Sequence, residues 1–345
     1  LYAGDFFVGE CAAFCNDAAP SNNLLSIVKK YETEFTWYFF AYKNSPAFRI
    51  FQDAGLHVRE LHEKSNIEDL LKNISTDIVI VGTSWQNRTH LEFIKKAREL
   101  HTPSIALLEH WVNYRERFGY PQEGWQENIA DFVTLNDEVG YAIAQELGFC
   151  NAIKLRFEAL LGDMQRYQTC KNEEENRVLF ISEPTKKVAF TTFGDENFWG
   201  FNEFEVCEEI CKNMDKFSTS CLTIRLHPSD EIQKYDYLLQ KYPNLSIEIE
   251  NPYEIPLINS LCKNRVIVGI DGFVLFEAMV LGKLSISLIP SSKRECVVPI
   301  FEQNKITTLE DLKLSDFEVK SSIDEINFFG IDFASMVKKI ANEKK

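Results

Sequence analysis

The segment Leu222–Glu231, LTIRLHPSDE, constrains the fold of this chain more than any other stretch. Its β-branched first half predicts a short strand, and the His-Pro step followed by Ser-Asp predicts a turn into a helix. The strand therefore delivers His227 and Pro228 to its carboxyl end. Open α/β sheets bind their ligands at that edge, so His227 is a candidate ligand-binding residue, and Arg225 shares its strand face.

A second strand-to-helix corner follows at Arg265–Ile270, which leads into a helix through Asp271, Gly272 and Phe273. Gly272 allows a ligand to approach the backbone, and the unblocked amides at the start of the helix attract anions. Asp271 is either an N-cap or an acceptor for ribose hydroxyls. Glu277 lies in an otherwise apolar helix, where a carboxylate is costly without a partner, and is a further candidate.

The whole chain alternates between strand and helix patterns. Buried parallel strands are predicted at 77–81, 104–108, 132–135, 178–182, 221–226, 266–270 and 284–289, and a terminal helix at 335–345. The polar stretch Asp163–Asn176 separates two such halves and is predicted to be a linker. The fold class is therefore α/β, with two Rossmann-like domains and parallel sheets, residues 1–165 and 166–345, the terminal helix crossing back.

Composition limits the classes of partner. The net charge of −15 argues against nucleic acid, and no apolar run is long enough to span a membrane. With no signal-peptide pattern, we expect a cytoplasmic protein whose nine cysteines are reduced thiols and which holds no structural metal. Dinucleotide-binding, P-loop, nucleophile-elbow and zinc-protease motifs do not occur in the sequence.

Further candidate residues follow other predicted strands. Ser291 and Ser292 come after the strand at 284–289, beside two basic residues, and suit phosphate. In the first half, Asp5 and Glu10 flank an early strand–loop segment as candidate base or nucleophile. The remaining candidates follow the strands at 77–81 and 104–108, where the aromatic groups suit stacking on a sugar ring: Thr83, Ser84, Glu109, His110, Trp111 and Arg115.

These residues resemble glycosyltransferases of the GT-B architecture. The R-L-H-P segment ending at Pro228 is similar to the His-Pro motif of bacterial sialyltransferases and Kdo transferases, where the His contacts donor phosphate. A second motif is similar to the sequence of the donor-binding corner in such enzymes. It consists of Asp271, Glu277, Ala278, Gly282 and Lys283. The chain departs from that pattern with Gly272 and Phe273 where Ser often stands. Val8–Glu10 resembles the loop that carries a catalytic Glu in Kdo transferases.

The resemblance implies two domains that face each other across a cleft, the first binding an acceptor and the second a nucleotide-sugar donor. It implies transfer of a sugar to the hydroxyl of a glycan or other acceptor in bacterial surface glycan assembly, without a cofactor or metal. A CMP-linked acidic sugar is the preferred donor, Glu10 or Asp5 would act as the base, and His227 would stabilise the departing phosphate. The donor set would comprise Arg225, His227, Pro228, Asp271, Gly272, Phe273, Glu277, Ser291 and Ser292.

Two alternatives stay open on the sequence. A UDP-sugar 2-epimerase-like enzyme would also bind a nucleotide sugar, but would need acid and base groups on both sides of the sugar and no acceptor pocket. A non-catalytic nucleotide-sugar-binding module would place no carboxylate at the anomeric carbon.

Overall fold

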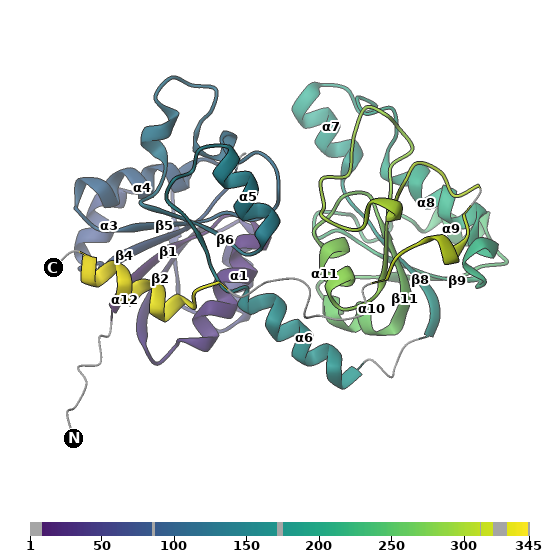
Figure 1. The fold of residues 1–345 in the computed structure, drawn as a ribbon, viewed down its shortest axis with the longest axis horizontal. Helices are drawn as coiled ribbons and strands as arrows, with labels where there is room; N and C mark the ends of the chain where they lie inside the picture. The colour runs from purple at the N-terminus through teal and green to yellow at the C-terminus, as the bar shows by residue number, and fades with distance from the viewer. Residues whose placement is uncertain (1–8, 85–86, 171–174, 311, 320–329, 344–345) are drawn as a thin grey trace. The chain divides into compact units, whose positions relative to one another are not determined.

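The computed structural model describes residues 9–84, 87–170, 175–310, 312–319 and 330–343 (Figure 1). The chain divides into two compact units. Unit 1 comprises Leu1–Gly162 and Ile326–Lys345, and unit 2 comprises Asp163–Glu325. Among the described residues, no helix has the length and apolarity needed to cross a bilayer.

Unit 1 is built on a seven-stranded, fully parallel sheet in the order β3-β2-β1-β4-β5-β6-β7. The strands are β1 (Gly9–Phe14), β2 (Phe35–Tyr42), β3 (Val58–Leu61), β4 (Ile78–Gly82), β5 (Ser104–Leu107), β6 (Phe132–Leu135) and β7 (Ala152–Lys154). The helices are α1 (Ala18–Lys30), α2 (Pro46–Asp53), α3 (Ile67–Asn73), α4 (Thr89–Glu99), α5 (Glu138–Glu146) and α12 (Phe333–Glu343), with short 3-10 turns at Glu116–Phe118 and Trp125–Asn128.

The central strands of unit 1 are apolar on both faces because helices cover both (Figure 1). Helices α1, α2 and α12 pack on one face, and α3, α4 and α5 pack on the other. The chain therefore returns to unit 1 at its C-terminal end. Ile331 forms a parallel bridge with Leu155, and the fully buried Phe333 packs in the aromatic cluster of β2.

Unit 2 is built on a six-stranded parallel sheet in the order β10-β9-β8-β11-β12-β13. The strands are β8 (Glu175–Ile181), β9 (Cys221–Arg225), β10 (Ser246–Glu250), β11 (Asn264–Gly269), β12 (Leu284–Leu288) and β13 (Lys305–Ile306). The helices are α7 (Thr185–Phe193), α8 (Glu203–Lys212), α9 (Tyr237–Lys241), α10 (Leu257–Lys263) and α11 (Val274–Val280), with 3-10 turns at Met214–Phe217, Glu302–Asn304 and Leu314–Asp316.

Two expectations for the middle of the chain are corrected. The first part of the predicted linker belongs to helix α6 (Glu158–Cys170), which crosses the boundary between the units. The expectation that every cysteine is a free thiol is also wrong, because Cys170 and Cys262 are joined as a disulfide with their Cα atoms 5.8 Å apart. Both cysteines lie in unit 2, where the bond ties the end of α6 to α10.

Candidate functional site

Each sheet has a point where the strand order reverses, and a ligand is expected there at the carboxyl ends of the strands. In unit 1 the reversal lies between β1 and β4, and in unit 2 it lies between β8 and β11. The loops after these four strands, and after their neighbours β5 and β9, therefore surround the expected ligand positions.

His227 lies in the turn that follows β9, as the sequence predicts, and is partly exposed. The Ser229 N–H donates to its Nδ1 over 3.1 Å. Because Nδ1 accepts this bond, the neutral ring carries its proton on Nε2. Burial lowers the pKa of His227, against the opposing charge of Asp230, so the ring is neutral near pH 7. Nε2 makes no hydrogen bond to any described residue and is an N–H donor at the edge of the sheet.

A buried polar network fixes the backbone of this turn. The Asp230 carboxylate accepts the His227 N–H over 2.9 Å and the Ser182 hydroxyl over 2.6 Å. Lys234 Nζ lies 2.8 Å from Asp230 and 2.9 Å from Glu203, and all three side chains are almost fully buried. The network joins β8, α8 and the His-Pro turn, so the position of His227 is set by tertiary contacts.

The corner between β11 and α11 differs from the expectation. The backbone N–H groups of Ile270, Asp271 and Gly272, called the amide corner below, all donate to Glu183 Oε1, over 3.2, 3.0 and 2.8 Å. The predicted unblocked amides are therefore occupied by a carboxyl group from the loop after β8. Burial, followed by the charge of Asp271, raises the pKa of Glu183 to about 8.

Asp271 is not a side-chain cap of α11, which has none. Its carboxylate pairs with the Arg294 guanidinium through two hydrogen bonds of 3.0 and 2.5 Å. Arg294 also lies 4.4 Å from the centre of the Trp199 ring and 3.9 Å from Glu183 Oε2. The corner thus holds two carboxyl groups and one cation, fixed by a bidentate pair.

The other predicted donor residues are dispersed around this corner. Arg225 is buried and pairs with Ser260 over 2.9 Å and with Glu250 over 3.6 Å, and Glu277 is close enough to affect its pKa. The Ser291 hydroxyl donates to the Trp199 carbonyl, and Ser292 is exposed. The Pro228 carbonyl accepts from Tyr253, and the Phe273 ring lies 5.7 Å from Phe276. The structure brings Asp271 and Gly272 together with Glu183 and leaves Arg225 in a buried ion pair.

In unit 1, Glu109 follows β5 at the carboxyl edge, and both of its carboxyl oxygens are shielded from solvent. Neither oxygen has a geometric hydrogen-bond partner among the described residues. Burial raises the pKa of Glu109 to about 7, although the neighbouring Asn23 amide and Arg117 guanidinium lower it in part. A carboxyl group with such a pKa can both accept and donate a proton near neutral pH.

The segment after Glu109 packs into the protein and does not form an exposed stacking surface. Trp111 is 5% exposed and its indole N–H donates to the Asp137 carboxylate over 3.1 Å. The expectation that aromatic rings here stack on a sugar is therefore wrong for Trp111, whose faces are covered by protein. His110 has a left-handed backbone with φ of 70°. Such conformations cluster at functional sites when surrounding contacts enforce them.

The hydroxyl and guanidinium groups beside Glu109 also have structural partners. Thr83 is buried, donates to the Leu107 carbonyl over 2.9 Å and accepts from Arg117 over 3.1 Å. Ser84 is buried and accepts the Asn87 N–H. Arg115 donates to the carbonyl of Leu147. These groups hold the edge of the sheet together around Glu109.

The expected catalytic position of Glu10 is wrong. Glu10 is the second residue of β1 and lies at the amino edge of the parallel sheet, opposite the edge that carries Glu109. Its N–H donates to Asp77 and its carboxyl group lies near Tyr38. The sequence pattern predicts a strand–loop segment between Asp5 and Glu10, whereas the strand itself runs over Gly9–Phe14. Asp5 lies outside the described residues.

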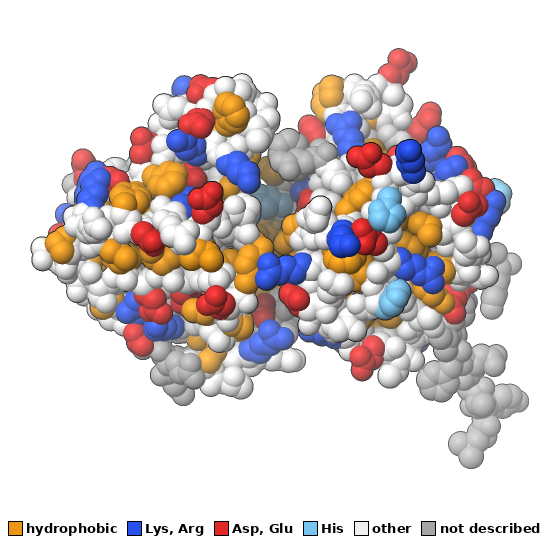
Figure 2. All heavy atoms as spheres, turned by 180° about the vertical axis from the view of Figure 1, so that it is seen from behind, with side chains coloured by type: hydrophobic (Ala, Val, Ile, Leu, Met, Phe, Trp, Pro, Cys, Tyr) orange, Lys and Arg blue, Asp and Glu red, His pale blue; other side chains and the backbone are white. Residues whose placement is uncertain are grey.

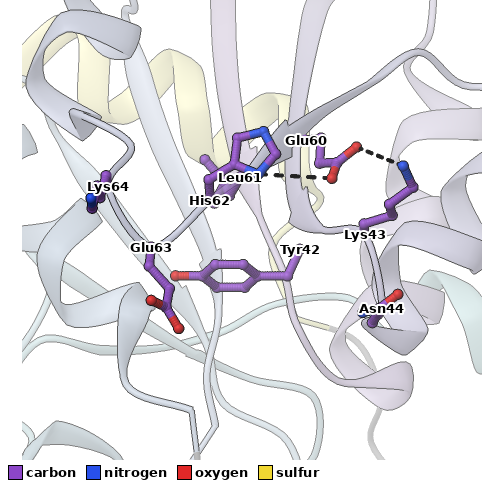
Figure 3. A pocket seen from close by; sticks show the side chains of 8 residues that line it. All are labelled: Tyr42, Lys43, Asn44, Glu60, Leu61, His62, Glu63 and Lys64. Atoms are coloured by element: carbon purple, nitrogen blue, oxygen red, sulfur yellow. Dashed lines mark ion pairs between the residues drawn. The ribbon is translucent and has the colours of Figure 1, made fainter.

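Unit 1 also contains an open pocket of about 480 Å³ at the carboxyl ends of β2 and β3. Glu60 lies between Lys43, 3.5 Å away, and His62, 3.8 Å away, as Figure 3 shows. The Tyr42 hydroxyl is 3.0 Å from that of Thr89. The lining is Tyr42, Lys43, Asn44, Glu60, Leu61, His62, Glu63 and Lys64, none of which was predicted from sequence (Figure 3).

Among the described residues, no group of three or more His, Cys, Asp or Glu side chains is placed to hold a metal ion. On the face drawn in Figure 2, basic side chains alternate with acidic ones. The expectations for metal and nucleic acid accordingly stay predictions from the sequence.

Sequence reasoning missed Glu183 and Arg294 as members of the corner. The signal for Glu183 was present, because it directly follows a predicted buried strand, as His227 does. Arg294 lies 23 positions from Asp271 in the chain, and no local pattern predicts that pairing.

No family model and no curated protein matches this sequence. Solved structures match its fold. UDP-GlcNAc 2-epimerase from Neisseria meningitidis, bound to UDP-GlcNAc, aligns over 83% of this chain and 84% of its own, with 12% identity and a TM-score of 0.55. MnaA of S. aureus with UDP aligns over 83% and 81%, with 13% identity and a TM-score of 0.56. HepE of Anabaena, in complex with UDP and glucose, aligns over 80% and 79%, with 10% identity and a TM-score of 0.50. Together with the two parallel sheets, these likenesses show that the chain has the two-Rossmann GT-B fold.

Proposed function

We propose that this chain is a glycosyltransferase that moves a sugar from a nucleotide-sugar donor to an acceptor hydroxyl. The observation that carries the proposal is His227, a neutral imidazole at the carboxyl edge of unit 2 whose Nδ1 is held by Ser229 and whose Nε2–H has no partner among the described residues. An N–H donor fixed at that edge is suited to the phosphate of a donor and to the charge on a departing nucleotide.

Unit 1 supplies the acid–base group in this proposal. Glu109 takes the role that was predicted for Glu10, because Glu109 lies at the ligand-binding edge and Glu10 does not. With a pKa of about 7, Glu109 is suited to take the proton of an acceptor hydroxyl, and this step requires the acceptor to reach a carboxyl group that is shielded from solvent in the structure.

The pocket beside β2 and β3 is the proposed place of the acceptor. It lies at the carboxyl edge of the same sheet as Glu109, with β1 and β4 between its strands and β5. It combines an aromatic side chain with carboxylate, ammonium and imidazole groups (Figure 3). Its size is in the usual range for small-molecule sites. Such a lining offers both donors and acceptors to the hydroxyl groups of a saccharide.

For the donor, a CMP-linked acidic sugar follows from the His-Pro resemblance, whereas the fold neighbours named above contain UDP or UDP-GlcNAc. Both are pyrimidine nucleotides, and we propose a pyrimidine nucleotide sugar as the donor class. A role in bacterial surface glycan assembly, catalysis without a metal, and a cytoplasmic location complete the proposal.

A UDP-sugar 2-epimerase is the second candidate. It is favoured by Glu109, since a group of pKa about 7 also suits removal and return of a sugar proton. Incubation with UDP-GlcNAc and no acceptor distinguishes the two: NMR detects a 2-epimer only for the epimerase, whereas a transferase leaves the sugar configuration at C2 unchanged.

The direct test of the proposal is nucleotide release. Purified protein is incubated with CMP-, UDP- and GDP-linked sugars and a mixture of saccharide acceptors, and free nucleotide and glycosylated product are measured by mass spectrometry. We expect one pyrimidine donor to be consumed, with a large loss of rate in His227→Ala and little change in His57→Ala, an exposed histidine of unit 1. Binding of nucleotide without any turnover would instead support the non-catalytic module.

A further inference from the structure

The loop after β8 crosses the switch point of unit 2. Strands β8 and β11 are neighbours where the strand order reverses, and Glu183, directly after β8, reaches the amide corner that follows β11. Three backbone N–H groups that converge on one oxygen form the kind of arrangement that receives a phosphate oxygen. In this chain a side chain of the protein already occupies it.

The contact is close and specific to these residues. Gly272 N lies 2.8 Å from Glu183 Oε1, and a Cβ at position 272 would lie only 3.0 Å from the same oxygen. Glycine at 272 therefore allows the carboxyl group, rather than an external ligand, to approach the backbone. All three N–H groups of the amide corner are satisfied, so a ligand gains nothing there unless Glu183 leaves.

The charges around the amide corner also disfavour additional anions. The Arg294 guanidinium is engaged by Asp271 through two hydrogen bonds. Glu183 is nearly buried, with a side-chain exposure of 14%, and shares the corner with the Asp271 carboxylate. A second phosphate group placed here would bring another negative charge close to Asp271 in a region of reduced dielectric.

We propose that Glu183 determines the phosphate count of the donor: by filling the amide corner it leaves room for one phosphate, contacted by His227, and excludes the second phosphate of a nucleoside diphosphate. This inference rests on the proposed function and deepens it, because it names nucleoside monophosphate sugars as the substrate class. Glu183 acts as a specificity-determining residue that occupies the place of the second phosphate.

The test compares monophosphate with diphosphate of the same base by isothermal titration of the full chain, using CMP against CDP and UMP against UDP. In the wild-type protein we expect the diphosphate to bind no more than about threefold tighter than the monophosphate. Glu183→Ala empties the amide corner and is expected to improve diphosphate binding at least about tenfold while monophosphate binding changes less than about threefold.

Two further variants control for effects that arise from a general loss of structure. Glu183→Gln keeps a carbonyl oxygen for the three N–H groups and is expected to bind like the wild type, and Glu231→Ala, an exposed residue of unit 2, serves as the matched control. Thermal unfolding of each variant is recorded alongside. A wild-type preference for the diphosphate of more than about tenfold, or an unchanged ratio in Glu183→Ala, overturns the inference.

Titration with inorganic pyrophosphate distinguishes failure of the proposed function from failure of the role proposed for Glu183. If the wild type binds no nucleotide at all, the proposed function is lost, while pyrophosphate binding to Glu183→Ala and not to the wild type still supports the role of Glu183. Absence of pyrophosphate binding in both proteins would count against that role as well.

Discussion

Glu109 and Glu183 are carboxyl groups whose pKa values are raised to about 7 and about 8, in both cases chiefly by burial. They lie at the carboxyl edges of different sheets, in the loops where ligands of α/β proteins bind. Perturbed acids in such positions are candidates for function, and the contacts separate their roles. Glu183 is held by three amides, whereas Glu109 has no geometric hydrogen-bond partner among the described residues.

Glu109 gives a prediction for stability. Its folded-state pKa of about 7 lies above the ordinary glutamate pKa of 4.5, so the folded protein binds the proton more tightly than the unfolded chain. The free energy of unfolding should therefore fall as pH rises from about 4.5 to about 7, by an amount on the order of 3 kcal/mol for this group. In Glu109→Gln that contribution disappears. Urea unfolding of both proteins at several pH values measures it, and parallel pH profiles would contradict the account.

Glu109 also gives a prediction for activity. As a general base it must be ionised, so the transfer rate should rise with pH through about 7. Glu109→Gln should lower kcat by about 10²- to 10⁴-fold, the usual contribution of general acid–base catalysis. Nucleotide affinity, which we assign to unit 2, should stay unchanged in the same variant. A variant with wild-type kcat would remove Glu109 from the chemistry.

Among single elements, the strands and the turns directly after them were the most predictable parts of the chain. The predicted strand at 221–226 and turn at His227 match β9 and its following loop, because a β-branched run before His-Pro has few other conformations. Strand β1 was misplaced because Gly9 resembles a strand end, although the apolar CAAF run that follows it is what the core buries.

The site was less predictable than the elements because its contacts are distant in sequence. Glu183 meets the amide corner across more than eighty positions, and the N–H of the buried Trp111 is accepted by Asp137, 26 positions away in another element. Local sequence patterns predict that a residue lies at a strand end or in a loop. They do not predict which side chain, distant in the sequence, contacts that residue.

Helix α1 and strand β4 meet at Gly82, which gives an element-scale prediction. A Cβ at this position would lie 2.6 Å from Pro20 Cβ and 2.7 Å from Cys15 Sγ, so either the strand or the helix must shift. Gly82→Ala should destabilise the protein by about 1–3 kcal/mol. Gly162→Ala in α6, where a Cβ meets nothing within 4 Å, is the matched control and should be neutral or stabilising. Equal unfolding midpoints for the two variants would contradict this packing.

Over the whole molecule, the chain first forms most of unit 1, then all of unit 2, and its last segment belongs to unit 1 again. Helix α12 belongs to the core of unit 1, and residues 163–325 form a continuous second unit. The alternation of strands and helices predicts two such units. The sequence pattern predicts a terminal helix that crosses back, but not its contacts, because α12 packs on residues near the other end of the chain.

The return of the chain is tested at Phe333, which is fully buried and lies 5.4 Å from Phe35 and 5.6 Å from Trp37 between ring centres. Phe333→Ala should lower the free energy of unfolding by about 3–5 kcal/mol, as for other buried phenylalanines. Phe190→Ala in unit 2, where the side chain is 56% exposed, should change it by less than about 0.5 kcal/mol. Urea unfolding monitored by circular dichroism compares the two, and similar losses would contradict the placement of α12.

We propose that unit 2 binds an activated sugar through His227, and isothermal titration of the full chain with CMP, CDP, UMP, UDP and GDP decides this. A pyrimidine nucleotide is expected to bind, and His227→Ala is expected to weaken its binding by about 1–3 kcal/mol, the loss of a hydrogen bond to a charged group. Failure of all five nucleotides to bind, or equal affinity in wild type and His227→Ala, would contradict it.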